Sequence, residues 1–398
     1  MEIKKILKDR KLKIALEKAI KSYKSNFERV IEKYPQTIEL AREVREIKKR
    51  SIDELKDNIK IAMESLEDNG INVHFAKDGR EANKLIYDLI DGNTVVKSKS
   101  MTSEEIGLRN FLESNGIEVW ETDLGEFIIQ ILNEKPMHVI TPAIHLTKDR
   151  IVEVLQKEIN SSSYKIQEIV DEVRKFMREK FVSARVGITG ANVLSAETGS
   201  LILIENEGNI RLTSTLPEKH IAIVGVEKIV YGLSDALKVA EVTWRFAGYK
   251  MPSYVDIIST PSKTGDVEKV VINGMHGAKE VHVILLDNGR LKAAENDVLK
   301  EALYCLRCGA CMYECQVYQN LSGYWGENYV GGIGIVWDYI TKGLINENVF
   351  CCLLCGRCKE ICPVNIDCAK INRWLRGVTF PNLNNNQCNE RHYNCSVE

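Results

Sequence analysis

The sequence predicts a mixed α/β fold with three successive parts and a short tail. Residues 1–69 contain no glycine, and apolar residues recur there at helical spacing. Over residues 70–291, short apolar segments alternate with amphipathic ones, a pattern typical of a mostly parallel α/β sheet. All twelve cysteines lie in the last quarter of the chain, so we expect a separate cysteine-rich domain at residues 292–380. Residues 381–398 are rich in asparagine and are expected to be a poorly ordered tail.

The N-terminal segment is expected to form two or three helices that end near Asn69-Gly70, where a glycine can cap a helix. Its apolar residues, such as Ile31, Val44 and Ile47, are separated by charged ones. Two interpretations fit these amphipathic helices: an arm that docks a partner, or a helical layer packed on the next domain. The second requires no additional protein and is favoured.

The α/β domain is expected to contain two sets of strands joined by helices. The first strands are predicted at Ile71–Phe75, Thr94–Val96, Ile117–Trp120 and His138–Thr141. The helices that join them are predicted at Arg80–Ile90, Ser103–Asn115 and Leu124–Asn133. A long helical stretch at Lys148–Lys180 leads to further strands at Leu201–Glu205, His220–Val224, Val255–Ile258 and His282–Leu286. The chain has no Gly-x-Gly-x-x-Gly motif and no P-loop, so it shows no nucleotide fingerprint.

Charge and hydropathy exclude several classes of partner. A formal net charge of −2 leaves no basic excess to neutralise phosphates, so no nucleic-acid partner is expected. No apolar run approaches the ~20 residues that span a bilayer. The N-terminus is charged throughout, unlike a signal peptide. A cytoplasmic location is expected, where thiols stay reduced and metal ligation is favoured over disulfides.

Eight of the cysteines form two runs with the same spacing. The runs are Cys305-x2-Cys308-x2-Cys311-x3-Cys315 and Cys352-x2-Cys355-x2-Cys358-x3-Cys362. Three thiolates at i, i+3 and i+6 can hold three corners of a 4Fe-4S cubane, and in two-cluster proteins the fourth cysteine of each run binds the other cluster. Zinc sites, the alternative, normally use pairs of Cys-x2-Cys motifs. The spacing therefore predicts two 4Fe-4S clusters with crossed ligands: Cys305, Cys308, Cys311 and Cys362 at cluster 1, and Cys352, Cys355, Cys358 and Cys315 at cluster 2.

The domain around these runs is expected to be helical. The runs are 36 residues apart, a longer gap than in a compact ferredoxin, and a helix is expected near Val336–Thr341. Gln316 stands where the first run would usually carry proline, which should alter loop stiffness without loss of a cluster. Cys351 is either an alternative ligand or an inert thiol, and Cys368 is expected to pack in the core. Cys388 and Cys395 lie in the asparagine-rich tail, and they are not favoured as cluster ligands.

Polar residues gather at the junctions between predicted strands and helices. The phrases are Lys97-Ser98-Lys99-Ser100, Glu121-Thr122-Asp123, Gly187–Asn192 and Asn206–Asn209. Ligands of open α/β sheets bind outside the C-terminal ends of the strands. The sequence therefore predicts a ligand site at this edge of the sheet.

These phrases and others occur in an order that resembles the LUD-domain iron–sulfur proteins, most closely the lactate-utilisation protein B family. The resemblance covers roughly residues 40–380 and includes KSKSMTSEEIGL, ETDLGE, PAIH, GITGAN, AETGSL, NEGN, TLPEKHIAIVGVEKIV, ISTPSKTGDVE, LLDNGR, CLRCGAC and CGRCKEICPV. It implies a LUD domain with a fold like the NagB/ribose-5-phosphate isomerase/CoA-transferase group, followed by an α-helical ferredoxin-like domain with two 4Fe-4S clusters. It also implies partners, namely a CCG-motif or flavin-linked subunit and a second LUD protein, in a complex that oxidises lactate to pyruvate. The C-terminal end looks short for the family, which leaves the partner interface open.

Four residues of the α/β domain are candidates for the site. Glu197 is either a catalytic carboxylate or a structural cap; the resemblance to CoA transferases, which use a glutamate nucleophile, bears on the first. Arg211 lies near it in sequence and can pair with a substrate carboxylate. Lys219 is a candidate for binding an anionic substrate. His145 either contacts a ligand or is a satisfied structural histidine.

Three functions follow from these features. The first is an electron-transfer subunit of an oxidoreductase complex that oxidises lactate or a related 2-hydroxy acid. Because the chain lacks a flavin or NAD fingerprint, a partner is expected to carry the two-electron chemistry. The second is an acyl- or CoA-transferase-like enzyme that uses Glu197, with the clusters as a relay. The third is a non-enzymatic redox sensor or scaffold.

Overall fold

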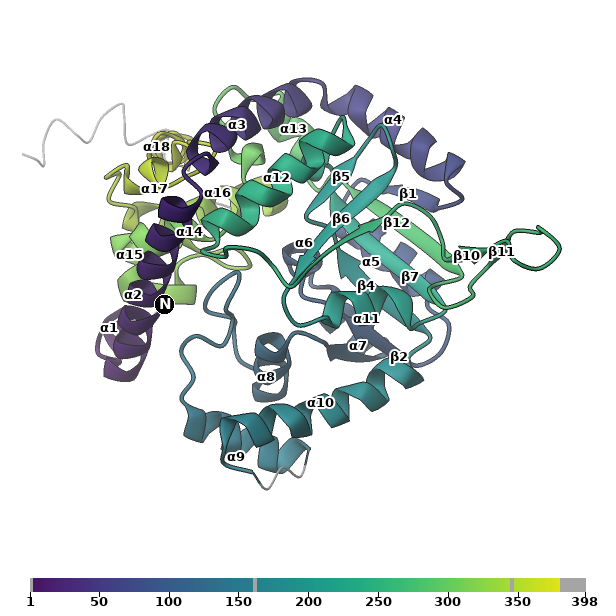
Figure 1. The fold of residues 1–398 in the computed structure, drawn as a ribbon. Coiled ribbons are helices and arrows are strands. Elements are labelled where there is room, and N and C mark those ends of the chain that lie inside the picture. Colours follow the sequence, from purple (N-terminus) through teal and green to yellow (C-terminus); the bar gives the residue numbers. More distant parts are fainter. Residues whose placement is uncertain (1–2, 160–162, 344–346, 380–398) are drawn as a thin grey trace, which may run out of the picture.

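The N-terminal segment is almost entirely helical and arches along one side of the molecule (Figure 1). The computed structural model describes residues 3–159, 163–343 and 347–379. The helices of this segment are α1 (Ile3–Leu7), α2 (Arg10–Lys33), α3 (Thr37–Asp53) and α4 (Leu55–Asp68). Asp9 begins α2 by accepting a hydrogen bond from the Leu12 N–H at 3.0 Å. The apolar faces of α2, α3 and α4 enter one core with the α/β domain and the C-terminal helices. The segment is therefore a layer packed on the rest of the chain.

A six-stranded sheet forms the centre of the α/β domain. Its order is β1-β12-β7-β4-β2-β3, and every neighbouring pair is parallel. The strands are β1 (Asn72–Ala76), β2 (Thr94–Lys97), β3 (Glu118–Glu121), β4 (Val186–Gly190), β7 (Lys219–Gly225) and β12 (Glu280–Leu286). Side chains alternate between the faces, so Val95 enters one helix-covered core and Val96 the other. The predicted parallel α/β sheet is confirmed.

Helices cover both faces of this sheet. One face carries α5 (Gly79–Leu89) and α7 (Leu108–Ser114), whose apolar residues pack on the central strands. The other helices of this region are α6 (Met101–Glu105), α8 (Leu124–Leu132), α9 (Lys148–Glu158), α10 (Ile166–Ser183) and α11 (Asn209–Thr215). At Gly187 in β4, a Cβ would lie 1.8 Å from the carbonyl oxygen of Thr213 in α11. Only glycine therefore allows α11 to lie so close to the strand.

The strand order of the main sheet reverses between the adjacent strands β2 and β4. From β2 the chain moves outward to β3, whereas from β4 it moves through β7 to β12 on the other side. Connections that leave two adjacent strands in opposite directions open a crevice outside their carboxyl ends, where ligands of such sheets bind. Ser98 follows β2 and Ala191 follows β4 at this position.

A second, smaller sheet lies beside the first (Figure 1). Its order is β8-β5-β6-β9, and α12 (Leu233–Phe246) packs on it. Its strands are β5 (Val193–Ser195), β6 (Ser200–Glu205), β8 (Ile229–Val230) and β9 (Tyr254–Ile258), and β8 follows the 3-10 turn η1 (Val226–Lys228). The hairpin of β10 (Lys263–Thr264) and β11 (Ile272–Asn273) projects away from the body in Figure 1.

Three predicted elements differ from the structure. The predicted helix at Ser103–Asn115 is the end of α6 followed by a separate helix α7, with a left-handed Gly107 between them. The predicted strand at His138–Thr141 is wrong, because this segment is irregular. The His138 side chain folds back and its Nδ1 accepts the N–H groups of Ile140 at 3.0 Å and Thr141 at 3.2 Å, which removes them from strand pairing. The predicted helical stretch at Lys148–Lys180 is two helices, α9 and α10.

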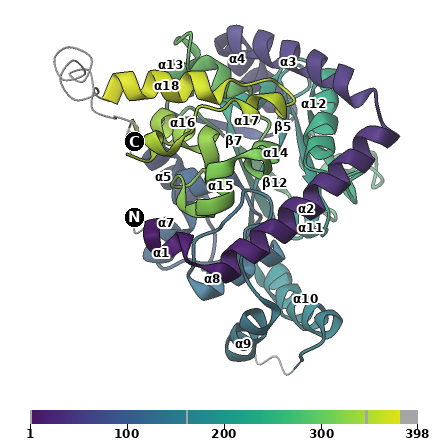
Figure 2. The same cartoon turned by 90° about the vertical axis from the view of Figure 1, so that its left-hand side faces the viewer.

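The C-terminal domain is helical, as predicted. It consists of α13 (Arg290–Ala294), η2 (Lys300–Tyr304), α14 (Ala310–Glu314), α15 (Gln316–Leu321), η3 (Ser322–Tyr324), α16 (Gly331–Lys342), η4 (Glu347–Cys351), α17 (Arg357–Glu360) and α18 (Cys368–Thr379). The helix predicted near Val336–Thr341 lies within α16. Tyr318, Trp325 and Trp337 are fully buried in its core. Figure 2 shows α2 running diagonally along the edge of this domain, and α2 contacts both α15 and α12.

Candidate functional site

The two cysteine runs share left-handed backbone at matching positions. In the first run, Arg307 and Gly309 flank Cys308 with φ of 61° and 77°. In the second run, Leu354 and Gly356 flank Cys355 with φ of 55° and 79°. Left-handed residues on both sides of a cysteine turn the backbone sharply, so that its N–H groups face a common concavity suited to anions. Each run thus forms the kind of loop that wraps an anionic cluster.

The eight thiols of the runs line two adjoining cavities. The first cavity is lined by Cys305, Cys308, Cys311 and Cys362, together with Cys358 and Cys368. The second is lined by Cys315, Cys352, Cys355 and Cys358, together with Cys311. Each cavity therefore contains one of the two crossed sets predicted from the spacing, with the fourth cysteine of one run among the thiols of the other. The shared walls at Cys311 and Cys358 place the cavities side by side.

The thiols are spread along the cavity walls. In the part of the chain that the structure describes, no three His, Cys, Asp or Glu side chains converge to hold a single metal ion. A cubane binds one thiolate at each of its iron corners, so its ligands need not converge on one point. The donor set fits a cluster of thiolate ligands in each cavity.

Burial makes several of these thiols poor acids without a bound metal. It raises the pKa of both Cys315 and Cys362 to about 12, and it raises that of Cys308 further. Backbone N–H groups oppose the shift, from Val317 and Tyr318 at Cys315 and from Val364 and Ile366 at Cys362. Such groups donate to ligand sulfurs and tune the potential of a bound cluster.

The two other cysteines that the structure describes lie in different surroundings. Cys368 is buried, lines the first cavity and interacts with Cys358, whose pKa it lowers. Cys351 ends η4 and lines neither cavity. Cys388 and Cys395 lie outside the described residues.

A cleft of about 790 Å³ opens at the carboxyl edge of the main sheet. Strand ends supply one wall: Ser98, Lys99 and Ser100 after β2, Asp123 after β3, Gly190, Ala191 and Asn192 at β4, and Glu205, Asn206, Glu207 and Asn209 at β6. The polar phrases picked out in the sequence therefore meet at one place, which includes the crevice between β2 and β4. The volume falls within the range of about 300–1,000 Å³ that is usual for ligand sites.

The opposite wall of the cleft comes from the N-terminal helix and the cysteine domain. Tyr23 of α2 stacks on Tyr313 of α14 with ring centroids 4.2 Å apart, and both rings line the cleft. The Tyr23 hydroxyl donates to the Phe246 carbonyl at 2.9 Å. Cys308 and Arg307 line both this cleft and the first cysteine cavity. A ligand in the cleft would therefore lie next to the thiols predicted to hold cluster 1.

Charged groups of both signs line the cleft. Lys99 Nζ lies 3.2 Å from Glu126 Oε1, and its side chain is 14% exposed. Lys228 Nζ donates to the Ala191 carbonyl at 2.7 Å, and burial lowers its pKa to about 8. Burial raises the pKa of Glu205 and of Glu207 to about 7. Because these carboxyls are partly protonated near neutral pH, the cleft tolerates an anionic ligand beside its lysines.

Two of the sequence-predicted residues lie outside the cleft, one on a turn of the second sheet and one in a helix that contacts this sheet. Glu197 is exposed on the turn between β5 and β6, where its N–H donates to Tyr231 at 2.8 Å and its carbonyl accepts from Ser65. Arg211 lies in α11, 2.9 Å from Asp256 and over the Tyr254 ring. Neither side chain lines the cleft.

The other two predicted residues also have local partners. His145 Nε2 lies 3.0 Å from Glu134 Oε2. Lys219 is the first residue of β7 and thus lies at the amino edge of the sheet, opposite the cleft, where it donates to the Leu89 carbonyl at 2.9 Å and to Asp91 at 2.7 Å. The structure therefore does not bring Glu197, Arg211, His145 and Lys219 together, and their roles stay predictions.

The sequence reasoning missed Lys228 and His138. Lys228 follows the predicted strand His220–Val224 by a few residues, so the strand-end rule applied once more would have pointed to it. His138 is buried against Gly309, and burial lowers its pKa to about 3, so it is neutral. No local pattern distinguishes such a histidine, because its neighbour Gly309 comes from the C-terminal domain.

Comparisons with known families agree with this architecture. A model of the LUD domain matches residues 59–286, and a model of a 4Fe-4S dicluster domain matches residues 301–366. The fold and the cysteine cavities thus define a LUD-domain iron–sulfur protein. The chain is 37% identical over 330 residues to lactate utilization protein B of Bacillus subtilis, an alignment that covers 81% of this chain and 67% of that protein. The chain belongs to the lactate utilization protein B family.

Two further proteins are similar to the chain, one in sequence and one in structure. An uncharacterized electron transport protein of Escherichia coli, YkgF, is 36% identical over 316 residues, which cover 77% of this chain and 65% of that protein. A crystal structure of a DUF162 family protein from Deinococcus radiodurans aligns with 58% of this chain and 98% of that chain at 14% identity. Its TM-score of 0.34 is too low to support an argument about the fold. No helix among the described residues is long and apolar enough to cross a membrane.

Proposed function

We propose that the chain is the iron–sulfur electron-transfer subunit of an oxidoreductase complex that oxidises lactate or a related 2-hydroxy acid to the 2-oxo acid. The observation that carries the proposal is the wall shared by the cleft and the first cysteine cavity, formed by Val139, Arg307 and Cys308. A substrate or a partner's redox group in the cleft would be in contact with the surroundings of cluster 1. When bound, each cluster would accept and pass on one electron.

The arrangement suggests an order for the electron path. The cleft adjoins the first cavity, and the first cavity adjoins the second through Cys311 and Cys358. Cys308 is buried, whereas Cys355 at the second cavity is exposed. Electrons would therefore enter beside Cys308 and leave near Cys355 to a partner, for which the CCG-motif or flavin-linked subunit and the second LUD protein are the candidates.

Residues of the cleft would bind and orient the substrate. Lys99 lies at the crevice between β2 and β4, and its ammonium is a partner for a substrate carboxylate. Tyr23 and Tyr313 close the opposite side and exclude water from that wall. The sequence shows no flavin or NAD fingerprint, so a partner would supply the hydride chemistry.

The first experiment measures composition. Anaerobic iron and sulfide analysis of the purified chain should give about eight irons, as two cubanes require. Electron paramagnetic resonance of the reduced protein should show two interacting clusters. About four irons per chain would contradict the two-cluster assignment.

The second experiment tests the substrate and the need for partners. The isolated chain with lactate and an artificial acceptor should show little turnover, and co-expression with the partner subunits should restore it. Lys99→Met should weaken lactate binding, followed by the fluorescence of Trp244 in the cleft wall, whereas Lys56→Met, an exposed lysine paired with Glu295, should not. Rapid turnover by the isolated chain would refute the partner requirement, and equal lactate binding by both variants would refute the role of the cleft.

A further inference from the structure

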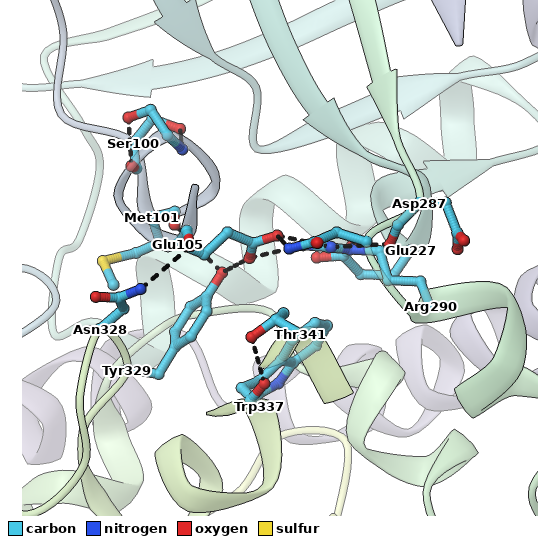
Figure 3. Close-up of polar contacts among 12 residues, drawn as sticks. Ser100, Met101, Glu105, Glu227, Asp287, Arg290, Asn328, Tyr329, Trp337 and Thr341 are labelled. Carbon is cyan, nitrogen blue, oxygen red and sulfur yellow. Dashed lines mark hydrogen bonds and ion pairs between the residues drawn. The ribbon is translucent and has the colours of Figure 1, made fainter. Parts of the chain in front are cut away.

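A buried ionic network joins the LUD domain to the cysteine domain (Figure 3). Arg290 of α13 is fully buried and binds Glu105 of α6 with both nitrogens of its fork, at 2.8 and 2.9 Å. Its Nε also binds Glu227, which follows β7. Tyr329 donates its hydroxyl hydrogen to Glu105 at 2.6 Å. The pKa of Glu227 is lowered to about 2, since attraction by Arg290 and Arg307 outweighs the opposing effect of burial.

The network reaches the first cysteine run through Arg307. This residue stands between Cys305 and Cys308, and its Nη2 lies 3.1 Å from Glu227 Oε1. Its guanidinium lies over the Trp337 ring at 3.6 Å and the Tyr329 ring at 4.5 Å. In the described residues, its Nε and Nη1 have no hydrogen-bond partner. The Arg307 guanidinium therefore has two buried N–H donors without a protein acceptor beside the cysteines of cluster 1.

Two lysines add further positive charge at the same place. Lys48 of α3 is 3% exposed and donates to the Glu227 carbonyl. Lys228, next to Glu227 in sequence, donates to the Ala191 carbonyl at 2.7 Å. Burial lowers the pKa of Lys48 to about 8, and the nearby Glu227 and Cys305 partly oppose this shift.

The charges of this group do not balance within the protein. Four cations (Lys48, Lys228, Arg290, Arg307) face two carboxylates (Glu105, Glu227), which leaves an excess of two positive charges. An unpaired buried charge is costly, so such an excess requires a negative partner. Four thiolates bring about four negative charges and an oxidised cubane core returns about two positive ones, so a bound cluster carries about −2. The excess matches the charge of one cluster.

We propose that Lys48, Lys228 and Arg307, anchored by the Glu105–Arg290–Glu227 network, form the counter-charge of cluster 1 and raise its reduction potential. The proposal rests on the two-cluster assignment above. Reduction adds one negative charge to the cluster, and nearby cations stabilise that form most where water is excluded. A 2-hydroxy acid is a weak reductant, so an acceptor beside the cleft needs a potential raised in this way.

The second cavity has different surroundings. Lys359 pairs with Asp367 at 2.9 Å, and their side chains are 41% and 25% exposed. Arg376 donates to the carbonyls of Val349 and Cys352. Exposure and pairing both reduce the field that these cations exert. Arg357 lines the second cavity but is exposed, so water screens its charge. Among these cations, the buried ones therefore lie beside cluster 1, where Lys48, Lys228 and Arg307 act through their charge on the cluster and not as its ligands.

The test is a redox titration of the full chain with its clusters, followed by electron paramagnetic resonance, with mediators and without substrate. In Lys228→Met, one of the two reduction waves should move to lower potential, with at least a tenfold change in its reduced-to-oxidised ratio, which is about 59 mV for one electron. The other wave should stay in place. Lys228→Arg, which keeps the charge, should retain the wild-type potentials. Lys48→Met should move the same wave, and the exposed Lys56→Met should move neither.

Each outcome decides the proposal. Unchanged waves in both Lys228→Met and Lys48→Met, equal movement of both waves, or a shift in Lys228→Arg as large as in Lys228→Met would overturn it. If Lys228→Met loses the iron of one cluster while Lys228→Arg keeps it, the requirement for charge is supported. If both variants lose it, packing at residue 228 is the cause and the proposal fails. No substrate is used, so these results are independent of which molecule the complex oxidises.

Discussion

Glu227 connects three segments of the chain, and its replacement by glutamine should destabilise the protein strongly. Glu227→Gln keeps the size of the side chain but removes the charge that pairs with Arg290 and Arg307. The network lowers the pKa of the buried Glu227 from 4.5 to about 2. A shift of that size corresponds to about 3 kcal/mol, since each pKa unit is worth about 1.4 kcal/mol. Removing one partner of a buried ion pair costs a similar amount, about 3–5 kcal/mol.

The assay is urea unfolding of the cluster-loaded protein under anaerobic conditions, followed by circular dichroism and by cluster absorbance. The free energy of unfolding of Glu227→Gln should fall by about 3 kcal/mol at pH 7. Glu295→Gln, which removes an exposed partner of Lys56, should leave the unfolding midpoint unchanged. Because the pKa of Glu227 is lower in the folded protein, its stabilisation is complete above pH 4.5 and is lost as the pH falls from 4.5 toward 2. A loss below about 1 kcal/mol, or an equal loss in both variants, would refute the reasoning.

Three further predictions concern the cysteines and the cleft. Cys355→Ser should lower the iron content and change the spectrum of one cluster, whereas Cys351→Ser should keep the wild-type iron content; equal iron content in both would contradict the ligand assignment. Binding of lactate should weaken as the pH rises through 7, because Glu207, whose pKa is about 7, then becomes negatively charged, and Glu207→Gln should reduce this dependence in a fluorescence titration. An unchanged pH profile in Glu207→Gln would argue against its part in the cleft. Glu197→Gln should leave lactate-driven reduction of the clusters unaltered in the reconstituted complex, and a loss of reduction with intact clusters would favour the transferase-like alternative.

Short-range patterns were sufficient to predict much of the fold. The alternation of apolar segments gave the positions of β1, β2, β3, β7 and β12, because a buried parallel strand needs a continuous apolar run. Strand β4 was missed, since its sequence from Val186 to Gly190 contains two glycines and a threonine. The glycine at position 187 is explained only by the close approach of α11, which sequence spacing does not reveal.

Parts of the site that depend on short-range patterns could also be predicted from the sequence. The cysteine spacing expresses the geometry of a single loop, and the strand-end rule led to Lys99 and Asn192 in the cleft. The single-residue candidates Glu197 and Lys219 were chosen by residue type, and both lie elsewhere. The ionic network joins residues as far apart as Glu105 and Arg290, so no local pattern could reveal it.

The stacking of Tyr23 on Tyr313 links ligand binding in the cleft to the assembly of the protein. These two rings bring the first long helix and the last domain of the chain onto the same cleft. The cleft is therefore complete only after the cysteine domain has taken its final form around its clusters. A ligand that binds only this assembled form stabilises it by mass action, by about 2.7 kcal/mol at a hundred times its Kd. A ligand of the cleft should thus protect the clusters from loss.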